Sequence, residues 1–295
     1  MSTMLEGVFT ALVTPFSNGE IDWAALEGLV EFQLRGGIHG LVPCGTTGES
    51  ATLSADEHDR LVRFVVERVA GRVPVLAGTG SNSTAEAVRH TLRARDCGAD
   101  AALVITPYYN KPTPAGLLEH YRQVAAVGLP VVVYNVPSRT GVCIDAETYS
   151  RLADIPGIVA TKEASGRFDL IEEVFAQGRL DLFSGDDALT LPLLCLGARG
   201  VISVASNVAP RAMVDLFDYV QEHHLSEARE LHRRLLPLFG ALFAETNPTP
   251  VKSALHSLGL IRDELRLPLL VASAATRARL EDLLEDLELT PDFAD

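Results

Sequence analysis

Short apolar runs alternate with amphipathic segments along most of the chain. The runs begin roughly 20 to 35 residues apart, which is the length of one strand–helix unit. Their nearly unbroken apolar character is typical of parallel strands that are buried on both faces. We therefore predict eight strands, at residues 8–16, 40–45, 73–80, 101–108, 130–137, 158–164, 181–185 and 200–206.

The segments between these runs have the pattern of helices. Ser54 precedes Glu57 and Ser83 precedes Glu86 at the spacing of a capping box, in which each side chain caps the other's backbone N–H group. Eight such alternations predict a (β/α)8 TIM barrel. An open doubly wound sheet is the alternative, but the first predicted strand is not followed by a glycine-rich dinucleotide turn. The predicted helices include residues 24–35, 55–70, 83–97, 114–127 and 186–196.

Almost ninety residues follow the eighth predicted strand, and their pattern is helical. We predict helices at 212–223, 226–243, 250–258 and 268–287, and a frayed end at 290–295. No shift in composition marks a separate unit. The expected organisation is a barrel at 1–207 and an appended C-terminal helical region at 208–295 that packs on it.

Composition and charge exclude several classes of protein. The formal charge is 25 − 39 = −14 and no basic stripe occurs, which argues against nucleic acid or an anionic membrane as a partner. Four widely spaced cysteines form no CxxC pair, so we expect no metal site and no disulfide framework. No apolar stretch approaches the ~18 residues of a membrane span, and no signal peptide is visible. We expect a cytoplasmic protein.

Lys162 is the leading candidate for a chemical role. The chain has only three lysines, Lys111, Lys162 and Lys252, and this one ends an apolar, β-branched run. A desolvated lysine can lose its proton and attack a carbonyl carbon, whereas arginine stays charged. Lys162 is therefore a candidate Schiff-base nucleophile. The alternative, which the spacing leaves open, is that its amine reaches from the strand end to a carboxylate such as Glu163.

Other polar residues gather at the ends of predicted strands, where barrel enzymes place their chemistry. Because strand side chains alternate, Lys162 is expected to share the interior face with Ala160 and Ile158, and Tyr134 with Val132. Tyr134 and Lys162 would then be neighbours on adjacent strands. Each feature also has a simpler interpretation: a turn that needs positive φ at a glycine, a packed tyrosine, or a surface ion pair.

Four motifs carry a resemblance to a known family. They are Gly45-Thr46-Thr47-Gly48-Glu49, Tyr134-Asn135-Val136-Pro137-Ser138-Arg139-Thr140-Gly141, Lys162-Glu163-Ala164 and Ser184-Gly185-Asp186-Asp187. In this order they resemble the dihydrodipicolinate synthase and N-acetylneuraminate lyase family of class I, pyruvate-dependent aldolases. The resemblance extends from about Val8 to Pro268.

The resemblance implies a role for most of these residues. Lys162 would form an imine with pyruvate, and Tyr134, Thr46 and Tyr109 would relay protons, Tyr109 reaching into the site of a neighbouring subunit. Thr47, Gly185 and Ile202 would line the pyruvate site. Arg139 would bind the carboxylate of L-aspartate semialdehyde, which favours that aldehyde as second substrate. The imine is the electron sink, so no metal or organic cofactor is expected.

The resemblance also implies a homotetramer, built as a dimer of dimers, and an effector site for L-lysine. The matching positions are Ser50, Ala51, His58, Asn82, Glu86 and Tyr108. Ala55 stands where lysine-sensitive members often have histidine, so we expect weak inhibition. Two alternatives to the function remain: another family aldolase acting on a 2-keto-3-deoxy sugar acid or sialic acid, and a non-catalytic homologue that binds keto acids.

Overall fold

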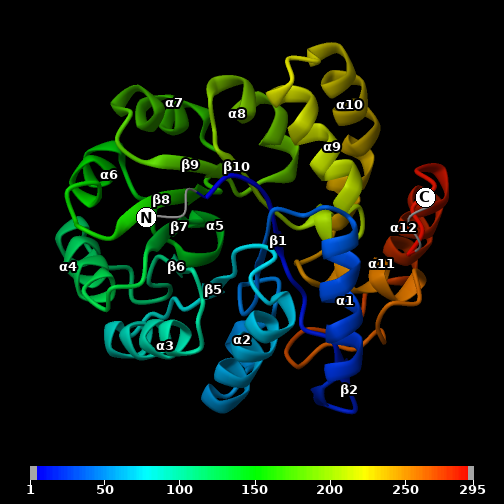
Figure 1. Ribbon diagram of the computed structural model, residues 1–295, viewed down its shortest axis with the longest axis horizontal. Helices are drawn as coiled ribbons and strands as arrows, with labels where there is room; N and C mark the ends of the chain where they lie inside the picture. The colour runs from blue at the N-terminus through cyan, green and yellow to red at the C-terminus, as the bar shows by residue number, and fades with distance from the viewer. Residues whose placement is uncertain (1–4, 292–295) are drawn as a thin grey trace.

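Eight parallel strands form one barrel in the computed structural model, which describes residues 5–291. Hydrogen bonds join them in the order β4-β1-β10-β9-β8-β7-β6-β5, and a bridge between Leu41 and Val75 closes the ring. Helices surround the strands (Figure 1). The predicted (β/α)8 TIM barrel is therefore confirmed. The strands are β1 (Gly7–Ala11), β4 (Gly40–Val42), β5 (Leu76–Gly78), β6 (Ala101–Ile105), β7 (Val131–Asn135), β8 (Ile158–Glu163), β9 (Asp181–Ser184) and β10 (Gly200–Ser203).

Two of the surrounding helices begin at the predicted serine caps, but only Ser54 and Glu57 form a complete capping box. At Ser83 the side chain accepts a hydrogen bond from Glu86 N, whereas Ser83 N donates to Ser81 Oγ at 3.1 Å, so the second predicted capping box was wrong. Ser54 Oγ accepts a hydrogen bond from Glu57 N at 3.2 Å, and a Glu57 carboxylate oxygen accepts one from Ser54 N at 2.8 Å. The helix predicted at 186–196 is divided into a 3-10 turn, Asp187–Leu189, and α8. The helices between β1 and β10 are α1 (Trp23–Arg35), α2 (Ala55–Val69), α3 (Thr84–Asp96), α4 (Pro114–Ala125), α5 (Pro137–Thr140), α6 (Ala146–Leu152), α7 (Phe168–Gln177) and α8 (Thr190–Leu196). Figure 1 shows the short α5 inside the ring that the others form.

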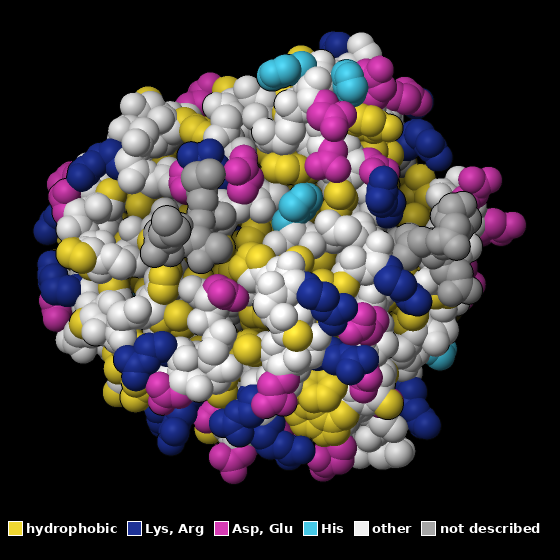
Figure 2. Space-filling view, in the orientation of Figure 1, with side chains coloured by type: hydrophobic (Ala, Val, Ile, Leu, Met, Phe, Trp, Pro, Cys, Tyr) yellow, Lys and Arg dark blue, Asp and Glu magenta, His cyan; other side chains and the backbone are white. Residues whose placement is uncertain are grey.

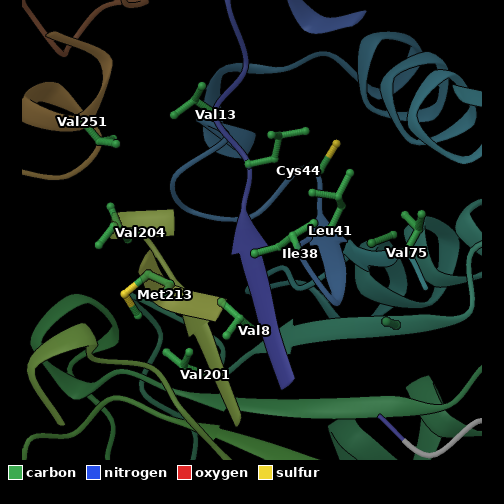
Figure 3. Close-up of a cluster of buried hydrophobic side chains, with 14 of the residues drawn as sticks. Val8, Val13, Ile38, Leu41, Cys44, Val75, Val201, Val204, Met213 and Val251 are labelled. Carbon is green, nitrogen blue, oxygen red and sulfur yellow. The ribbon is translucent and has the colours of Figure 1, made fainter. Parts of the chain in front are cut away.

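Strand side chains alternate between two apolar layers. Phe9 and Ile202 point into the barrel, where they pack with Val132 and Phe183. Val8, one residue before Phe9, belongs to the outer layer between strands and helices. Figure 3 shows Val8 and Val201 in this outer layer, with Met213 of a later helix close by. The barrel interior is thus a packed core, and its polar groups are confined to the strand ends.

A β-bulge at Val159 changes one predicted side-chain direction. Val131 pairs with Ile158 and Val132 with Ala160, so Val159 has no partner of its own across β7 and β8. Ala160 packs in the barrel interior, whereas Ile158 packs in the outer layer. The prediction that Ile158 shares the interior face with Lys162 was wrong, because it assumed unbroken alternation through an inserted residue.

A short hairpin follows β1, where a longer strand was predicted. It consists of β2 (Phe16–Ser17) and β3 (Glu20–Ile21), joined by Asn18 and Gly19, which both have positive φ (54° and 82°). Such a pair of residues suits the tight turn of a two-residue hairpin. The carboxylate of Glu264 accepts the backbone N–H groups of Asn18 and Gly19, so the C-terminal part of the chain holds this turn.

The C-terminal part of the chain contains α9 (Pro210–Gln221), α10 (Leu225–Leu242), α11 (Thr249–Ser257) and α12 (Ala274–Asp286). In Figure 1, α11 and α12 lie at the edge of the molecule beyond α1. The last helix was predicted from residue 268, but Ser273 caps it by accepting a hydrogen bond from Thr276 N, and residues 268–273 are not helical. Of the end expected to fray, 290–295, residues 292–295 lie outside the described residues.

A buried ion pair connects this helical part to the barrel. Lys252 Nζ on α11 donates to Glu49 Oε1 at 2.6 Å and to Thr14 O at 2.8 Å. Glu49 Oε2 accepts the backbone N–H of Arg266 at 3.0 Å. Both charged side chains are fully enclosed. Because each charge has lost its water, each depends on the other, and the pair fixes α11 to the loop after β4.

Charged side chains of both signs are interspersed on the surface, as Figure 2 shows for one face. Several pair, such as Arg68 with Glu27 and Glu31. Among residues 5–291, no helix combines the length and the apolar character that crossing a bilayer requires.

Candidate active site

Lys162 lies at the C-terminal end of β8 and is only 5% exposed. Its Nζ sits over the ring of Tyr134, 4.3 Å from the ring centroid. Burial lowers the pKa of Lys162 to about 8; the charge of Asp187 opposes this shift and that of Arg139 adds to it. A lysine with this pKa holds a usable fraction of neutral amine near pH 7, which a nucleophile needs.

Glu163, the next residue, points to the other side of the strand. Its carboxylate accepts hydrogen bonds from the Tyr149 hydroxyl at 2.6 Å, Asn135 Nδ2 at 3.0 Å and Ser165 N at 2.7 Å. In the described part of the chain Lys162 forms no ion pair, so the alternative in which its amine reaches Glu163 is wrong. The amine is enclosed but is left available for a ligand.

Tyr134 is the neighbour of Lys162 on the adjacent strand. The two residues are paired in the register of β7 and β8, so the predicted adjacency is confirmed. Burial raises the pKa of Tyr134, while the charge of Arg139 and a side-chain hydrogen bond with Thr46 act in the opposite direction. The phenol therefore stays protonated near neutral pH and has a hydroxyl partner to exchange protons with.

The loop after β4 presents Thr46 and Thr47. Positive φ occurs at Cys44 (56°) and Glu49 (54°), rather than at the glycines of this loop. Gly48 is needed for another reason: a Cβ there would lie 3.1 Å from Leu12 O and 3.2 Å from Cys44 N. The interpretation that this loop merely needs positive φ at a glycine was therefore wrong. Backbone strain at non-glycine residues is typical of functional loops.

Arg139 and Thr47 are joined by a residue that sequence analysis missed. Arg139, on the short helix α5, donates from Nη2 to Asn247 O at 3.0 Å. Asn247 Nδ2 in turn donates to Thr47 Oγ1 at 3.0 Å, while its buried Oδ1 has no partner within residues 5–291. Asn247 lies far from both residues along the chain and follows no strand, so no local pattern indicated it.

Gly185 allows Ala164 and Lys162 to pack closely against the backbone. A Cβ at this position would lie 2.7 Å from Ala164 Cβ and 3.1 Å from Lys162 Cε, so a larger residue would displace one of them. Gly185 N donates to Glu163 O at 2.8 Å. Ile202, on β10, is completely buried in the barrel interior. Both residues therefore shape the space beneath the strand ends.

Asp187 is a buried carboxylate to which sequence analysis assigned no role. Its Oδ2 accepts hydrogen bonds from Val204 N at 3.1 Å and Ala205 N at 2.9 Å, and burial raises its pKa. Its Oδ1 is enclosed with no partner within residues 5–291. The charge of Asp187 acts on the amine of Lys162, so it is part of the electrostatic environment of the site.

The structure does not place Tyr109 beside Tyr134 and Thr46, the other members of the predicted proton relay. It is 89% exposed and has a positive φ of 73°. It does not line the cavity that contains Thr46 and Tyr134. An exposed tyrosine on a strained backbone has no evident function within its own chain.

One cavity of about 610 Å³ joins the strand ends to the space between α2 and α3. Thr46, Tyr134 and Arg139 line it, whereas Lys162 lies against the ring of Tyr134 and is not part of the wall. The cavity also contains five of the six residues expected at the effector site, namely Ser50, Ala51, His58, Glu86 and Tyr108. The sixth, Asn82, does not line it, and its carbonyl oxygen accepts a hydrogen bond from Asn110 Nδ2 at 2.8 Å.

Comparison with known proteins extends these observations. A profile of the dihydrodipicolinate synthetase family matches residues 4–287. The 4-hydroxy-tetrahydrodipicolinate synthase of Magnetococcus marinus is 53% identical over 97% of this chain and 99% of its own length.

Two solved structures of such synthases carry small molecules. That from Acinetobacter baumannii, complexed with pyruvate, is 42% identical with a TM-score of 0.94, covering 97% of this chain and 100% of that chain. That from Cyanidioschyzon merolae, with lysine bound, is 41% identical with a TM-score of 0.93, covering 97% and 99%. Together with the profile match over nearly the whole chain, these similarities show that the chain belongs to the dihydrodipicolinate synthetase family.

Proposed function

We propose that the chain is a lyase, a 4-hydroxy-tetrahydrodipicolinate synthase, that condenses pyruvate with L-aspartate 4-semialdehyde. This reaction is the first committed step of diaminopimelate and lysine biosynthesis. The observation that carries the proposal is the buried amine of Lys162, with a pKa lowered to about 8, against the ring of Tyr134. The family membership and the pyruvate complex of the Acinetobacter baumannii relative support it.

The reaction begins when the neutral amine of Lys162 attacks the keto carbon of pyruvate and water leaves, giving an imine. The protonated imine withdraws electrons, so a methyl proton is lost and an enamine forms. The enamine carbon attacks the aldehyde carbon of the second substrate. The amino group of that substrate then attacks the imine carbon and displaces Lys162, which closes the ring and frees the enzyme.

Tyr134 and Thr46 carry protons between these steps. Both side chains line the same cavity, which supports this role because it gives a path from the reacting centre towards the cavity. Tyr109 completes the relay in the site of a neighbouring subunit. Its 89% exposure and strained backbone support a role outside its own chain, within a homotetramer built as a dimer of dimers.

Pyruvate and the aldehyde are held by different groups. Thr46 and Thr47 bind the pyruvate carboxylate, while Gly185 and Ile202 leave and shape the space for its methyl end. Arg139 lines the cavity and binds the carboxylate of the semialdehyde, since a guanidinium can grip both carboxylate oxygens. Its bond to Asn247 O supports this role by fixing its direction.

The far end of the cavity binds L-lysine as a weak inhibitor. Ser50, Ala51, His58, Glu86 and Tyr108 line that end, and the carboxylate of Glu86 suits the ammonium group of the ligand. The lysine complex of the Cyanidioschyzon merolae relative supports the proposal. Ala55 also lines the cavity, and because its side chain has no polar group, the ligand makes one polar contact fewer.

The organisation that we propose is a barrel at 1–207 with an appended helical region at 208–295, in a cytoplasmic enzyme. The helical region is not independent of the site, because it contributes Asn247 to the cavity wall and Lys252 to the ion pair with Glu49.

Reductive trapping tests the central step. The purified protein is treated with sodium borohydride with and without pyruvate, digested, and analysed by mass spectrometry. We expect a carboxyethyl group on Lys162 only when pyruvate is present. Lys111 and Lys252 are internal controls, because any non-specific reaction would also label the exposed Lys111. Absence of label on Lys162, or equal label on Lys111, would refute Schiff-base catalysis.

A second assay tests the aldehyde. Condensation with L-aspartate semialdehyde is compared with retro-aldol cleavage of a 2-keto-3-deoxy sugar acid and of sialic acid. We expect only the condensation, and we expect Arg139→Met to raise KM for the semialdehyde much more than KM for pyruvate. Preferential cleavage of either sugar acid would assign the chain to another reaction of the same family.

A further inference from the structure

Two neighbouring helices bring together three side chains that sequence analysis did not connect. His58 and Asp59 lie on α2, and His90 lies on α3. One ligand atom from each residue lies within 4.8 Å of the others, and the two imidazole ring centroids are 4.4 Å apart. The histidines are distant in sequence, so no ligand spacing is visible along the chain.

The hydrogen bonds of His58 determine which of its nitrogens is available. Its Nε2 lies 2.8 Å from Gly78 O, and because a carbonyl oxygen can only accept, this nitrogen carries a proton. In the neutral ring Nδ1 therefore holds a lone pair, and it lies 3.4 Å from Asp59 Oδ1. Two acceptors then face each other with no hydrogen between them. A cation placed between them would satisfy both acceptors.

His90 can supply a second nitrogen ligand. Its half-buried imidazole is tilted by 51° against that of His58, and one of its nitrogens lies within 4.8 Å of the ligand atoms of the other two residues. A neutral imidazole is the form that coordinates a metal ion. The neighbouring charges are mixed, since Arg89 and Glu86 both act on this ring.

We propose that His58, Asp59 and His90 form a binding site for a divalent transition-metal ion of the zinc type. Two imidazoles and a carboxylate are a common ligand set for such ions, whereas calcium and magnesium prefer oxygen ligands alone. Two ligands that are each about 2 Å from a tetrahedral ion lie about 3.3 Å apart. The 3.4 Å between His58 Nδ1 and Asp59 Oδ1 matches this spacing.

The remaining geometry leaves room for an exchangeable ligand. Three protein ligands occupy three positions of a tetrahedral ion, so one position stays open. His58 and His90 both line the cavity, so the open position faces the space that also reaches Tyr134. The competing cation is Arg93, whose Nε lies 3.7 Å from Asp59 Oδ2. Its side chain is 61% exposed and can swing into solvent when the ion binds.

This site is separate from the amine chemistry, because no step of the proposed reaction uses it. Its test therefore measures binding and does not depend on the outcome of the borohydride experiment. Protein without a polyhistidine tag is stripped with EDTA and desalted. It is then titrated with Zn²⁺ near neutral pH in competition with a chromophoric chelator. Cys143 and Cys195 are exposed, so the titration is repeated after alkylation of the thiols.

We expect one zinc ion per chain before and after alkylation. His90→Asn and Asp59→Asn should each weaken zinc binding by about tenfold or more. His223→Asn is the matched control, because His223 is exposed and its positive φ of 64° is one that asparagine tolerates. Far-UV circular dichroism verifies that each variant is folded.

Three outcomes would overturn the proposal. One is the absence of a stoichiometric zinc ion in the alkylated protein. Another is wild-type affinity in both His90→Asn and Asp59→Asn. The third is an equal loss of affinity in His223→Asn, which would indicate dispersed surface binding.

Discussion

Replacing Lys162 by methionine should abolish activity and, at pH 7, stabilise the protein. The fall of the pKa of Lys162 from 10.5 to about 8 on folding corresponds to about 3 kcal/mol. Below pH 8 the amine is protonated in both the folded and the unfolded states, so this cost of burying the charge is fully present. Methionine has a similar shape and carries no charge, so the variant should recover up to about 3 kcal/mol in free energy of unfolding.

The pH dependence distinguishes this explanation from a simple gain in packing. As pH rises from about 8 towards 10.5, the folded wild type binds fewer protons than the unfolded chain, so its stability rises and the penalty disappears. The advantage of Lys162→Met should therefore shrink over the same interval. The same pKa makes about one amine in ten neutral at pH 7, against about one in three thousand for an ordinary lysine.

Urea unfolding at several pH values, at one fixed protein concentration, measures both effects. Lys111→Met is the control, because Lys111 is exposed and should respond little at any pH. A Lys162→Met variant that is less stable than wild type at pH 7 would refute the reasoning. So would a gain in stability that stays constant up to pH 10.5.

Three further predictions follow from single contacts. Lys252→Ala leaves Glu49 buried without its cation and should lower the free energy of unfolding, measured in urea, by about 3–5 kcal/mol. The double replacement Lys252→Met with Glu49→Gln should recover most of this loss. Tyr134→Phe keeps the ring beneath Lys162 but removes the hydroxyl, so kcat should fall about 10²- to 10⁴-fold. Circular dichroism should show that the fold is retained. An unchanged kcat would exclude a proton relay through this residue. Gly185→Ala places a Cβ 2.7 Å from Ala164 Cβ and should raise KM for pyruvate in steady-state kinetics. A wild-type KM would show that pyruvate does not bind beside Gly185.

The pairing of Tyr134 with Lys162 could be predicted because it depends only on local pattern. Apolar runs located the strands, and alternation placed both side chains on the interior face. The same alternation failed at Ile158, because a β-bulge reverses the side-chain direction there. Composition does not predict such a bulge. The Asn18–Gly19 hairpin was overlooked although that dipeptide favours a tight turn, because the apolar run before it was extended too far.

Residues that reach the site from distant parts of the chain could not be predicted in this way. Asn247 contacts Thr47 across 200 positions, and His90 approaches His58 from the next helix. Neither residue stands at a strand end or in a recognisable motif. Such contacts follow from how the helices pack on the barrel, which a single sequence does not reveal by periodicity.

The ion pair between Glu49 and Lys252 has a consequence for co-translational folding. All eight strands, with Lys162 and Tyr134 among them, are synthesised before Lys252 is added. Since folding during synthesis starts from the N-terminal end, a nascent barrel can close while the carboxylate of Glu49 still lacks its cation. We expect the loop after β4 to reach its final form only after Lys252, which lies among the last 44 residues, has been added. Until then, we expect the reactive amine of Lys162 to lack a complete binding site.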